Sequence, residues 1–220
     1  MNDLTILYYT SNIINDIFAN NVRNHLLQSS GGEIPIISVS QKPIEFGDNL
    51  CVLGLTPSIY NIYVQILMGA KLIKTKYTAC CEDDCLYVSQ HFEHRSPDAF
   101  AYNVNRWNVD EKGVYFYRHR RGMCMCIAPT DLLVSTIETR LAKYSDPTAN
   151  IPHFGEPGRW ETRLGLPEVK LEEFETKIPC LHFNHRDSQG SKRQLRTLDI
   201  IYGELDYWGS AKELWNRIHG

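Results

Sequence analysis

Leu4-Thr5-Ile6-Leu7-Tyr8-Tyr9 is a run of β-branched, aliphatic and aromatic residues that predicts a buried strand. Residues 13–27 then carry apolar side chains at helical spacing after the turn and capping residues Thr10-Ser11-Asn12, and Gly31-Gly32 ends the pattern. Ile34-Pro35-Ile36-Ile37-Ser38-Val39-Ser40 predicts a second buried strand. Because a strand, a helix and another strand form a βαβ unit, we expect the two strands to pair in parallel with a right-handed crossover.

The alternation of strand and helix continues beyond this unit. Leu50–Leu53 is a short apolar segment, and Pro57-Ser58 opens a predicted helix that runs to about residue 74. Tyr77-Thr78-Ala79 begins a further strand, which leads into the acidic triplet Glu82-Asp83-Asp84. The first ninety residues therefore predict a doubly wound α/β sheet, in which ligands bind at the carboxyl ends of the strands.

The second half of the chain changes character. Two apolar segments, 114–117 and 123–127, flank a basic turn and predict an antiparallel hairpin. Thr130-Asp131 is expected to cap a helix over residues 132–143. A Pro- and Gly-rich irregular loop follows over 145–169, then a short strand over 178–183 and a C-terminal helix over 211–218.

Composition narrows the class of protein. Of 220 residues, 43% are hydrophobic and 22% charged, which is typical of one sizeable globular domain. A net charge of −3 argues against a globally basic nucleic-acid binder. No stretch approaches the roughly 18 apolar residues of a membrane span, and the N-terminus lacks the pattern of a secretory signal. Seven cysteines in mostly apolar runs suit a reducing compartment, so we expect a cytoplasmic protein without a membrane partner.

The acidic triplet is the main candidate for chemistry. Like charges at the end of a buried strand repel one another, and a divalent cation that takes carboxylate oxygens and holds phosphates removes this cost. Side chains alternate along an extended strand, so Glu82 and Asp84 are expected to face one ion while Asp83 points away. Two alternatives remain: a solvated acidic turn, and a zinc site built from Cys80, Cys81, Cys85 and His91.

Three segments carry a family resemblance. They are Tyr8-Tyr9-Thr10-Ser11-Asn12, Ser38-Val39-Ser40-Gln41-Lys42-Pro43 and Glu82-Asp83-Asp84-Cys85-Leu86-Tyr87 followed by His91-Phe92. Over roughly residues 4–143 they resemble GT-A type nucleotide-sugar glycosyltransferases, especially the small family-2-like enzymes of phages and bacteria. The resemblance implies a Rossmann-like, mostly parallel sheet with helices on both faces. It also implies that Mn²⁺ or Mg²⁺ is held by an Asp-x-Asp motif or a variant of it, here with Glu82 in place of the first Asp, which makes Asp84 the firmer ligand.

The same resemblance assigns roles to further residues. It implies a single glycosyltransferase domain over 1–220, with a nucleotide-sugar-binding half over about 1–95 and an acceptor half over about 96–220. Late histidines complete the metal site in such enzymes, which points to His182, with His185 as the second choice and a surface role as the alternative. The expected contacts to the donor, most simply a UDP-sugar, come from Tyr9, Thr10, Asn12, Ser40, Lys42, Gln65, Glu82 and Asp83.

Transfer to a hydroxyl needs a base and an acceptor site. Glu156, which lies among turn-forming residues, is the candidate base, and together with the metal-binding Asp84 it forms the candidate catalytic pair. The alternative for Glu156 is an ordinary ion pair with Arg159 or Arg163. Arg120, Arg121 and Arg193 belong to two basic clusters that suit phosphate contacts.

The expected acceptor follows from those clusters and from the resemblance to phage enzymes. Such relatives glycosylate hydroxymethylated pyrimidines, so double-stranded DNA bearing these bases is the expected acceptor, in the host-cell cytoplasm if the chain is viral. The alternatives are a glycan or surface-polysaccharide glycosyltransferase and a catalytically inactive nucleotide- or DNA-binding protein.

Overall fold

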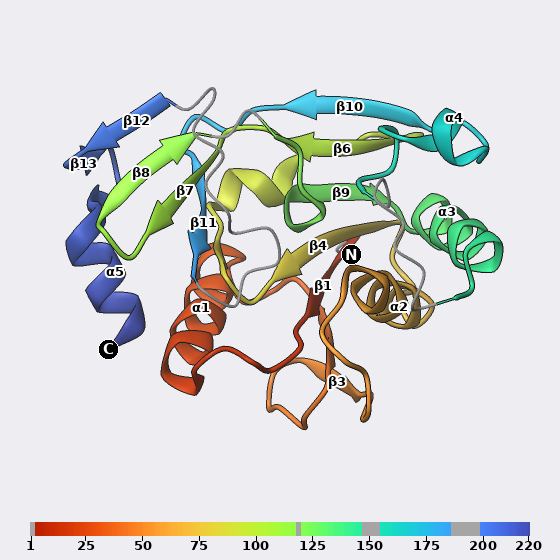
Figure 1. Ribbon diagram of the computed structural model, residues 1–220, viewed down its shortest axis with the longest axis horizontal. Coiled ribbons are helices and arrows are strands. Elements are labelled where there is room, and N and C mark those ends of the chain that lie inside the picture. The colour runs from red at the N-terminus through yellow and green to blue at the C-terminus, as the bar shows by residue number, and fades with distance from the viewer. Residues whose placement is uncertain (1–2, 118–119, 147–154, 186–198) are drawn as a thin grey trace.

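A computed structural model describes residues 3–117, 120–146, 155–185 and 199–220. A seven-stranded sheet forms its centre (Figure 1). In spatial order its strands are β10 (Lys170–Phe174), β6 (Ala99–Asn103), β9 (Cys126–Pro129), β4 (Tyr77–Glu82), β1 (Leu4–Tyr9), β2 (Ile36–Ser40) and β3 (Asp48–Cys51). Within this sheet β9 alone runs antiparallel to its neighbours, so the predicted α/β fold with a mostly parallel sheet is confirmed.

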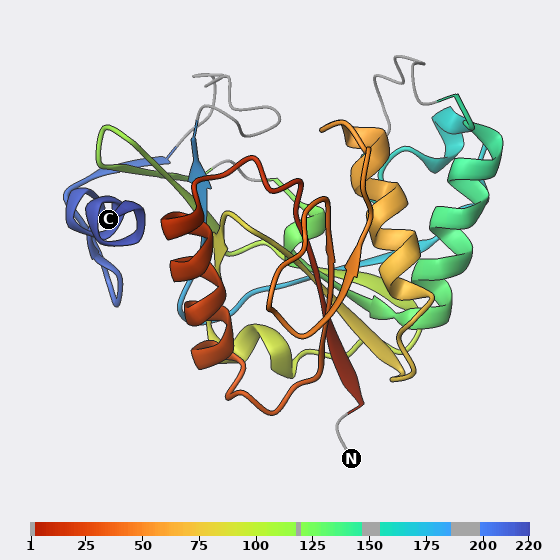
Figure 2. The same cartoon turned by 90° about the horizontal axis from the view of Figure 1, so that it is seen from below.

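Helices cover both faces of this sheet (Figure 2). On one face lies α1 (Asp16–Ser29), and on the other lie α2 (Ile59–Ala70) and α3 (Thr130–Lys143). Alternation along β1 explains the two layers: Ile6 belongs to the core that includes Phe18 of α1, whereas Leu7 belongs to the core that includes Ile66 of α2. The sheet therefore separates two apolar cores.

The predicted βαβ unit is present, with a different start to its helix. Ile6 pairs with Ile36 in parallel register. The helix cap is Asn15, whose Oδ1 accepts hydrogen bonds from the amides of Ile17 and Phe18, so the expectation of capping by residues 10–12 is wrong. The reason is that the chain after β1 runs through residues 10–14 before it turns into α1.

The second long helix begins as predicted and ends early. The hydroxyl of Ser58 caps it by accepting from the amide of Asn61. It ends at Ala70 rather than near residue 74, because the amides of Leu72 and Ile73 bond to the carbonyls three residues back, in a tighter turn that leads toward β4.

A second, five-stranded sheet was not predicted. Its order is β12 (Asp199–Tyr202), β8 (Val114–Tyr117), β7 (Arg106–Asp110), β11 (Cys180–Asn184) and β5 (Cys85–Leu86). The expected hairpin of residues 114–117 with 123–127 is wrong, because β8 pairs with β7 while β9 enters the first sheet. The turn between β7 and β8 is set by Gly113 at φ 71° and by the Asp110 carboxylate, which accepts from the amides of Lys112 and Val114.

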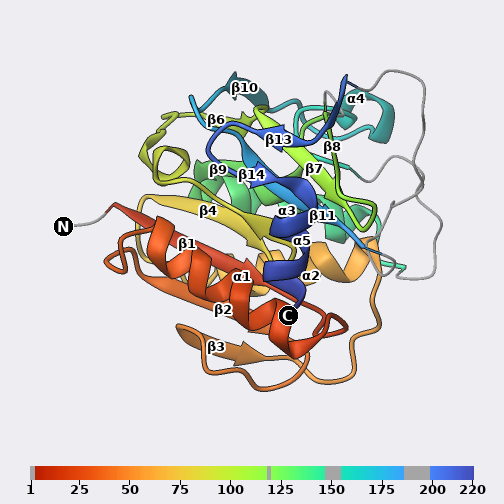
Figure 3. The same ribbon diagram turned by 90° about the vertical axis from the view of Figure 1, so that its left-hand side faces the viewer.

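The rest of the chain completes the layers. Thr130 is the first residue of α3 rather than its cap, since its hydroxyl donates to the Thr75 carbonyl. The remaining elements are η1 (Ser89–Glu93), η2 (Met123–Met125), α4 (Glu161–Leu164), β13 (Glu204–Leu205), β14 (Gly209–Ser210) and α5 (Ala211–His219). Figure 3 shows α5 packed beside α1. Within the described ranges, no helix has the length and apolar character needed to cross a bilayer.

Candidate functional site

A cavity of about 340 Å³ lies where β1 and β4 end. Its wall includes the acidic triplet at the end of β4, the end of β1 with the loop that follows it, residues of β7 and β11, the first turns of α2 and residues 120–124. Because the carboxyl ends of parallel strands meet at one edge of a sheet, the polar residues that follow β1 and β4 are brought together there.

Strand register brings the first two acids into contact with β1. Tyr9 and Glu82 are direct partners across the parallel pair, and the Tyr9 hydroxyl donates to Oε1 of Glu82 at 2.8 Å. One residue further on, the Thr10 hydroxyl donates to Oδ2 of Asp83. Asp83 was expected to point away from the other acids, but it also lines the cavity.

Asp84 contacts two histidines from the far end of the chain. Its Oδ2 lies 3.3 Å from Nε2 of His182 and 3.6 Å from Nε2 of His185. His182 sits on β11, which is antiparallel to β5 immediately after the triplet, and the amide of Phe183 donates to the Asp84 carbonyl. The second sheet thus places both sequence-predicted histidines beside the acids.

Four side chains in this cluster have the spacing of a metal site. One ligand atom from each of Glu82, Asp84, Cys85 and His182 lies within 4.8 Å of the others. Carboxylate and imidazole ligands suit Mn²⁺, and carboxylates suit Mg²⁺, so Glu82, Asp84 and His182 fit the expected divalent cation, whereas the thiol of Cys85 is a softer ligand than these ions prefer. The zinc alternative does not fit: Cys80 and Cys81 belong to opposite cores and His91 lies among aromatic rings.

Electrostatics in the cluster favour a cation. Burial, together with Cys124 and Asp84, raises the pKa of Glu82 well above its ordinary value. Burial and Asp84 raise the pKa of Asp83 to about 7. Burial also opposes ionisation of Asp84, but His182 and His185 outweigh it and hold its pKa below the ordinary range. A divalent cation would relieve the mutual repulsion that raises the first two pKa values.

Three predicted donor contacts lie outside the cavity wall. Asn12 uses its Oδ1 to accept from the amides of Gln41 and Lys42. Lys42 is exposed, and Ser40 is buried against Asn49. These residues brace the loops after β1 and β2, because polar atoms at strand ends first satisfy neighbouring backbone.

Gln65 takes an intermediate position. It lines the cavity and is buried, and its Nε2 donates to the carbonyls of Thr10 and Val39. It therefore ties α2 to the ends of β1 and β2.

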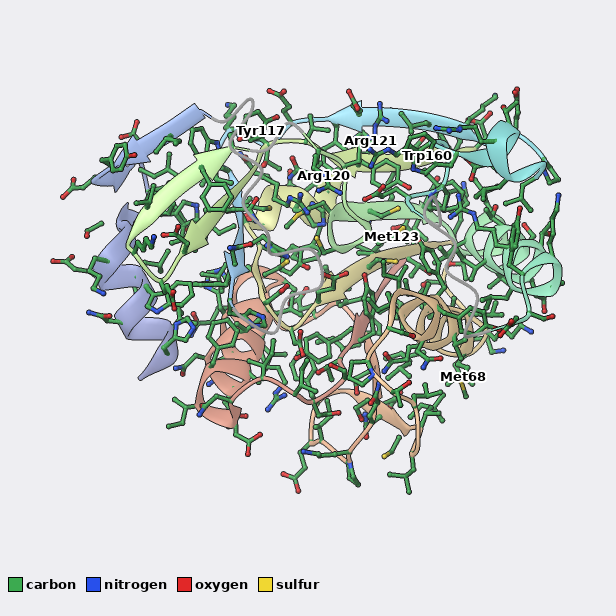
Figure 4. The ribbon with its side chains drawn as sticks, in the orientation of Figure 1. Met68, Tyr117, Arg120, Arg121, Met123 and Trp160 are labelled. Carbon is green, nitrogen blue, oxygen red and sulfur yellow. The ribbon has the colours of Figure 1, made fainter. Side chains whose placement is uncertain are left out.

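The candidate base and the acceptor arginines face the same cavity. Glu156 lines it and pairs with Arg159 at 3.1 Å, which is the ion pair expected as the alternative to a base. Arg120 and Arg121 line it near Met123 (Figure 4), and Nε of Arg121 donates to Glu173 at 2.5 Å. Arg193 lies outside the described residues.

The structure adds three cavity residues that sequence reasoning missed. Arg106 and Asn108 project from β7, and Cys124 comes from η2. Nδ2 of Asn108 lies 2.8 Å from Nδ1 of His182, its direct neighbour across β7 and β11. The one sequence signal was the Asn-rich composition of residues 103–108, which does not identify a cavity without the pairing of β7 with β11.

Comparisons with known proteins place the chain only loosely. No family model matches the sequence, and no curated protein matches it. One similar solved structure is the crystal structure of a glycosyltransferase involved in the glycosylation of the major capsid of PBCV-1. It superposes with a TM-score of 0.49 and 10% sequence identity over 81% of this chain and 92% of that chain.

Proposed function

We propose that this protein is a glycosyltransferase that moves a sugar from a nucleotide-sugar donor to an acceptor hydroxyl with the help of a divalent cation. The observation that carries the proposal is the convergence of Glu82, Asp84 and His182 in one cavity at the carboxyl edge of a Rossmann-like sheet. Ligands with phosphate groups bind at this edge in open α/β folds. The halves over about 1–95 and 96–220 would then supply the donor and acceptor walls.

The donor side is formed by the edge of β1 and the acidic triplet. Glu82, Asp84 and His182 would hold Mn²⁺ or Mg²⁺, with His185 beside Asp84 as an additional partner. A cation held by these residues would supply positive charge to the leaving diphosphate. Tyr9 and Thr10 hold Glu82 and Asp83 in place, and Gln65 fixes the loop that follows β1. A UDP-sugar is the donor to test first.

The acceptor side offers one carboxylate. Glu156 is partly buried, with 14% of its side chain accessible to solvent, and it lines the same cavity as the acidic triplet. In the proposed reaction the Glu156 carboxylate takes the proton of the acceptor hydroxyl as that oxygen attacks the anomeric carbon. Arg159 orients the carboxylate through its ion pair.

For the acceptor we propose double-stranded DNA bearing 5-hydroxymethylated pyrimidines. Arg120 and Arg121 give the cavity a cationic side, and Arg193 adds a further cation in the sequence. Contacts of this kind to phosphates are sequence-independent and weaken with salt. A glycan or surface-polysaccharide acceptor is the competing outcome.

The test follows labelled sugar into product. The protein is incubated with Mn²⁺ and a panel of UDP-sugars, with 5-hydroxymethylcytosine DNA, 5-hydroxymethyluracil DNA, unmodified DNA or free oligosaccharides. We expect label in the modified DNA only. Plots of log DNA affinity against log salt concentration should become shallower by about one unit of slope for each of Arg120, Arg121 and Arg193 that is changed to Gln. Label in oligosaccharide but not in modified DNA assigns the enzyme to glycan synthesis. Binding of UDP-sugar without any transfer would assign it to the inactive nucleotide-binding proteins.

A further inference from the structure

Arg106 is a cation inside the cavity wall, at the first position of β7. It is only 9% exposed. Asn108 is two positions further along the strand, so both side chains project from the same face, and Asn108 contacts His182. Arg106 therefore lies on the metal side of the cavity.

The guanidinium of Arg106 has few protein partners. It offers five N–H donors in a planar fork. Nη1 donates to Sγ of Cys124 at 3.3 Å, and a thiol is a weak acceptor. Within the part of the chain that the structure describes, Nε is buried without a hydrogen-bond partner and the side chain forms no ion pair. Most of the hydrogen-bonding capacity of this side chain is unused.

A buried charge with so few partners is costly to keep. Buried cations are normally paired, and replacing one by an apolar side chain of similar volume is often neutral or stabilising. Packing nevertheless holds Arg106 in place: a Cβ on Gly122 would lie 2.3 Å from Nη1, so the backbone at Gly122 passes directly over the guanidinium. Among the described residues, no acid thus neutralises this fixed cation by direct contact.

We propose that Arg106 binds an oxyanion of the nucleotide-sugar, either a phosphate of the leaving diphosphate or a carboxylate on the sugar that is transferred. The identity of that molecule rests on the proposed function, whereas the oxyanion site rests on Arg106 itself. The planar fork matches the two oxygens of a carboxylate or phosphate in a bidentate pair, which a lysine cannot form. Such a contact would be made by the Nη end of the guanidinium, because Nε is buried.

The first experiment measures oxyanion binding directly. Inorganic pyrophosphate and malonate are titrated by calorimetry, at fixed Mn²⁺, into the wild type and Arg106→Met. Arg95→Met is the control, because Arg95 pairs with Asp3 and is not part of the cavity wall. We expect at least one probe to bind about 10- to 100-fold more weakly to Arg106→Met and equally to the control. Equal binding to Arg106→Met, or no binding of either probe by the wild type, would overturn the oxyanion site.

A second comparison identifies the source of the oxyanion. Affinities for UDP, UDP-glucose and UDP-glucuronate are measured with the same proteins. If Arg106→Met binds all three ligands more weakly, the oxyanion that Arg106 contacts is the diphosphate. If only the affinity for UDP-glucuronate falls, that oxyanion is the sugar carboxylate. A uniform affinity for all three in both proteins would remove Arg106 from the donor site.

Folding and function are separated by further readouts. Arg106→Met should keep the melting temperature of the wild type, whereas a purely structural arginine would lower it. Arg106→Lys keeps the charge without the fork and should bind the probes with intermediate affinity. Arg106-dependent pyrophosphate binding without any sugar transfer would preserve the oxyanion site and overturn the proposed function. Sugar transfer at the same rate in the wild type and in Arg106→Met would preserve the proposed function and overturn the oxyanion site.

Discussion

Nε2 of His182 lies 3.3 Å from Oδ2 of Asp84, while Nδ1 of the same ring lies 2.8 Å from the side-chain amide of Asn108. The ring is thus held from both sides. Oδ1 of Asn108 is buried without a hydrogen-bond partner among the described residues. Turning this amide by 180° lets Oδ1 accept from an Nδ1–H, which leaves the Nε2 lone pair for a cation.

Asn108→Ala should therefore weaken Mn²⁺ binding by about 10- to 100-fold, because a ligating histidine depends on the partner of its other nitrogen. Calorimetric titration with Mn²⁺ measures this, and Asn24→Ala, at an exposed position of α1, is the matched control. Unchanged Mn²⁺ affinity in a folded Asn108→Ala protein would exclude Asn108 as a support of the metal site.

Glu156→Gln should retain donor affinity and lose about 10²–10⁴ in transfer rate, because the amide keeps the size of the side chain but cannot accept a proton. Single-turnover transfer and UDP-sugar titration separate the two effects. Arg159→Met is the control for the ion pair: if it slows transfer as much as Glu156→Gln does, the ion pair rather than the base is the important feature.

Gly69→Ala should lower the free energy of unfolding by about 1–3 kcal/mol. Alanine is the better helix former by about 1 kcal/mol, but its Cβ would lie 2.3 Å from Cδ1 of Leu7 and 2.7 Å from Cγ2 of Val39. The cost of overpacking α2 against the sheet should exceed the gain in helix propensity. Urea unfolding measures the change, and a more stable Gly69→Ala protein would contradict the packing of α2 on β1 and β2.

Acid should destabilise the protein through His91. Burial lowers the pKa of this histidine from 6.5 to about 3, so the unfolded chain takes up a proton at higher pH than the native protein does. The contribution of His91 to stability is full above pH 6.5 and falls by about 1.4 kcal/mol per pH unit as the pH drops toward 3.

His91→Phe places another ring among Tyr87, Phe92 and Phe174 and removes this titration. Urea unfolding between pH 4 and 7 should give a shallower pH dependence for the variant, whatever its absolute stability. Parallel pH profiles for the two proteins would show that His91 is not buried in its neutral form.

The first half of the fold could be predicted because its signals are local. The apolar run of β1 and the helical spacing before Gly31 each fit one periodicity, and Ser58 caps α2 as expected. The second sheet could not be predicted in this way. Its central pair joins β7 to β11, whose partners Asn108 and His182 are 74 residues apart, and no local pattern encodes that pairing.

The site residues show the same difference between local signals, which the sequence reveals, and tertiary contacts, which it does not. The position of the acidic triplet follows from the end of a strand, so Glu82 and Asp84 could be placed from sequence. Asn12 and Ser40 have the same polar appearance, yet they bond to neighbouring backbone and to Asn49. Whether such a side chain faces a ligand or a loop depends on contacts that form only in the folded protein. Arg106 was missed because its burial arises from contacts with Gly122 and Cys124, which lie more than fifteen positions away in the sequence.

The most direct test of the metal-dependent transferase is UDP release from UDP-sugars by the wild type and Asp84→Asn, with Mn²⁺ or with EDTA. Asp98→Asn, at an exposed ion pair with Lys170, is the matched control. We expect release by the wild type and the control only when Mn²⁺ is present, and a loss of at least about 10²-fold in Asp84→Asn, since several kcal/mol of charge stabilisation disappear with the ligand. Release by Asp84→Asn at the wild-type rate, or undiminished release in EDTA, would contradict the account.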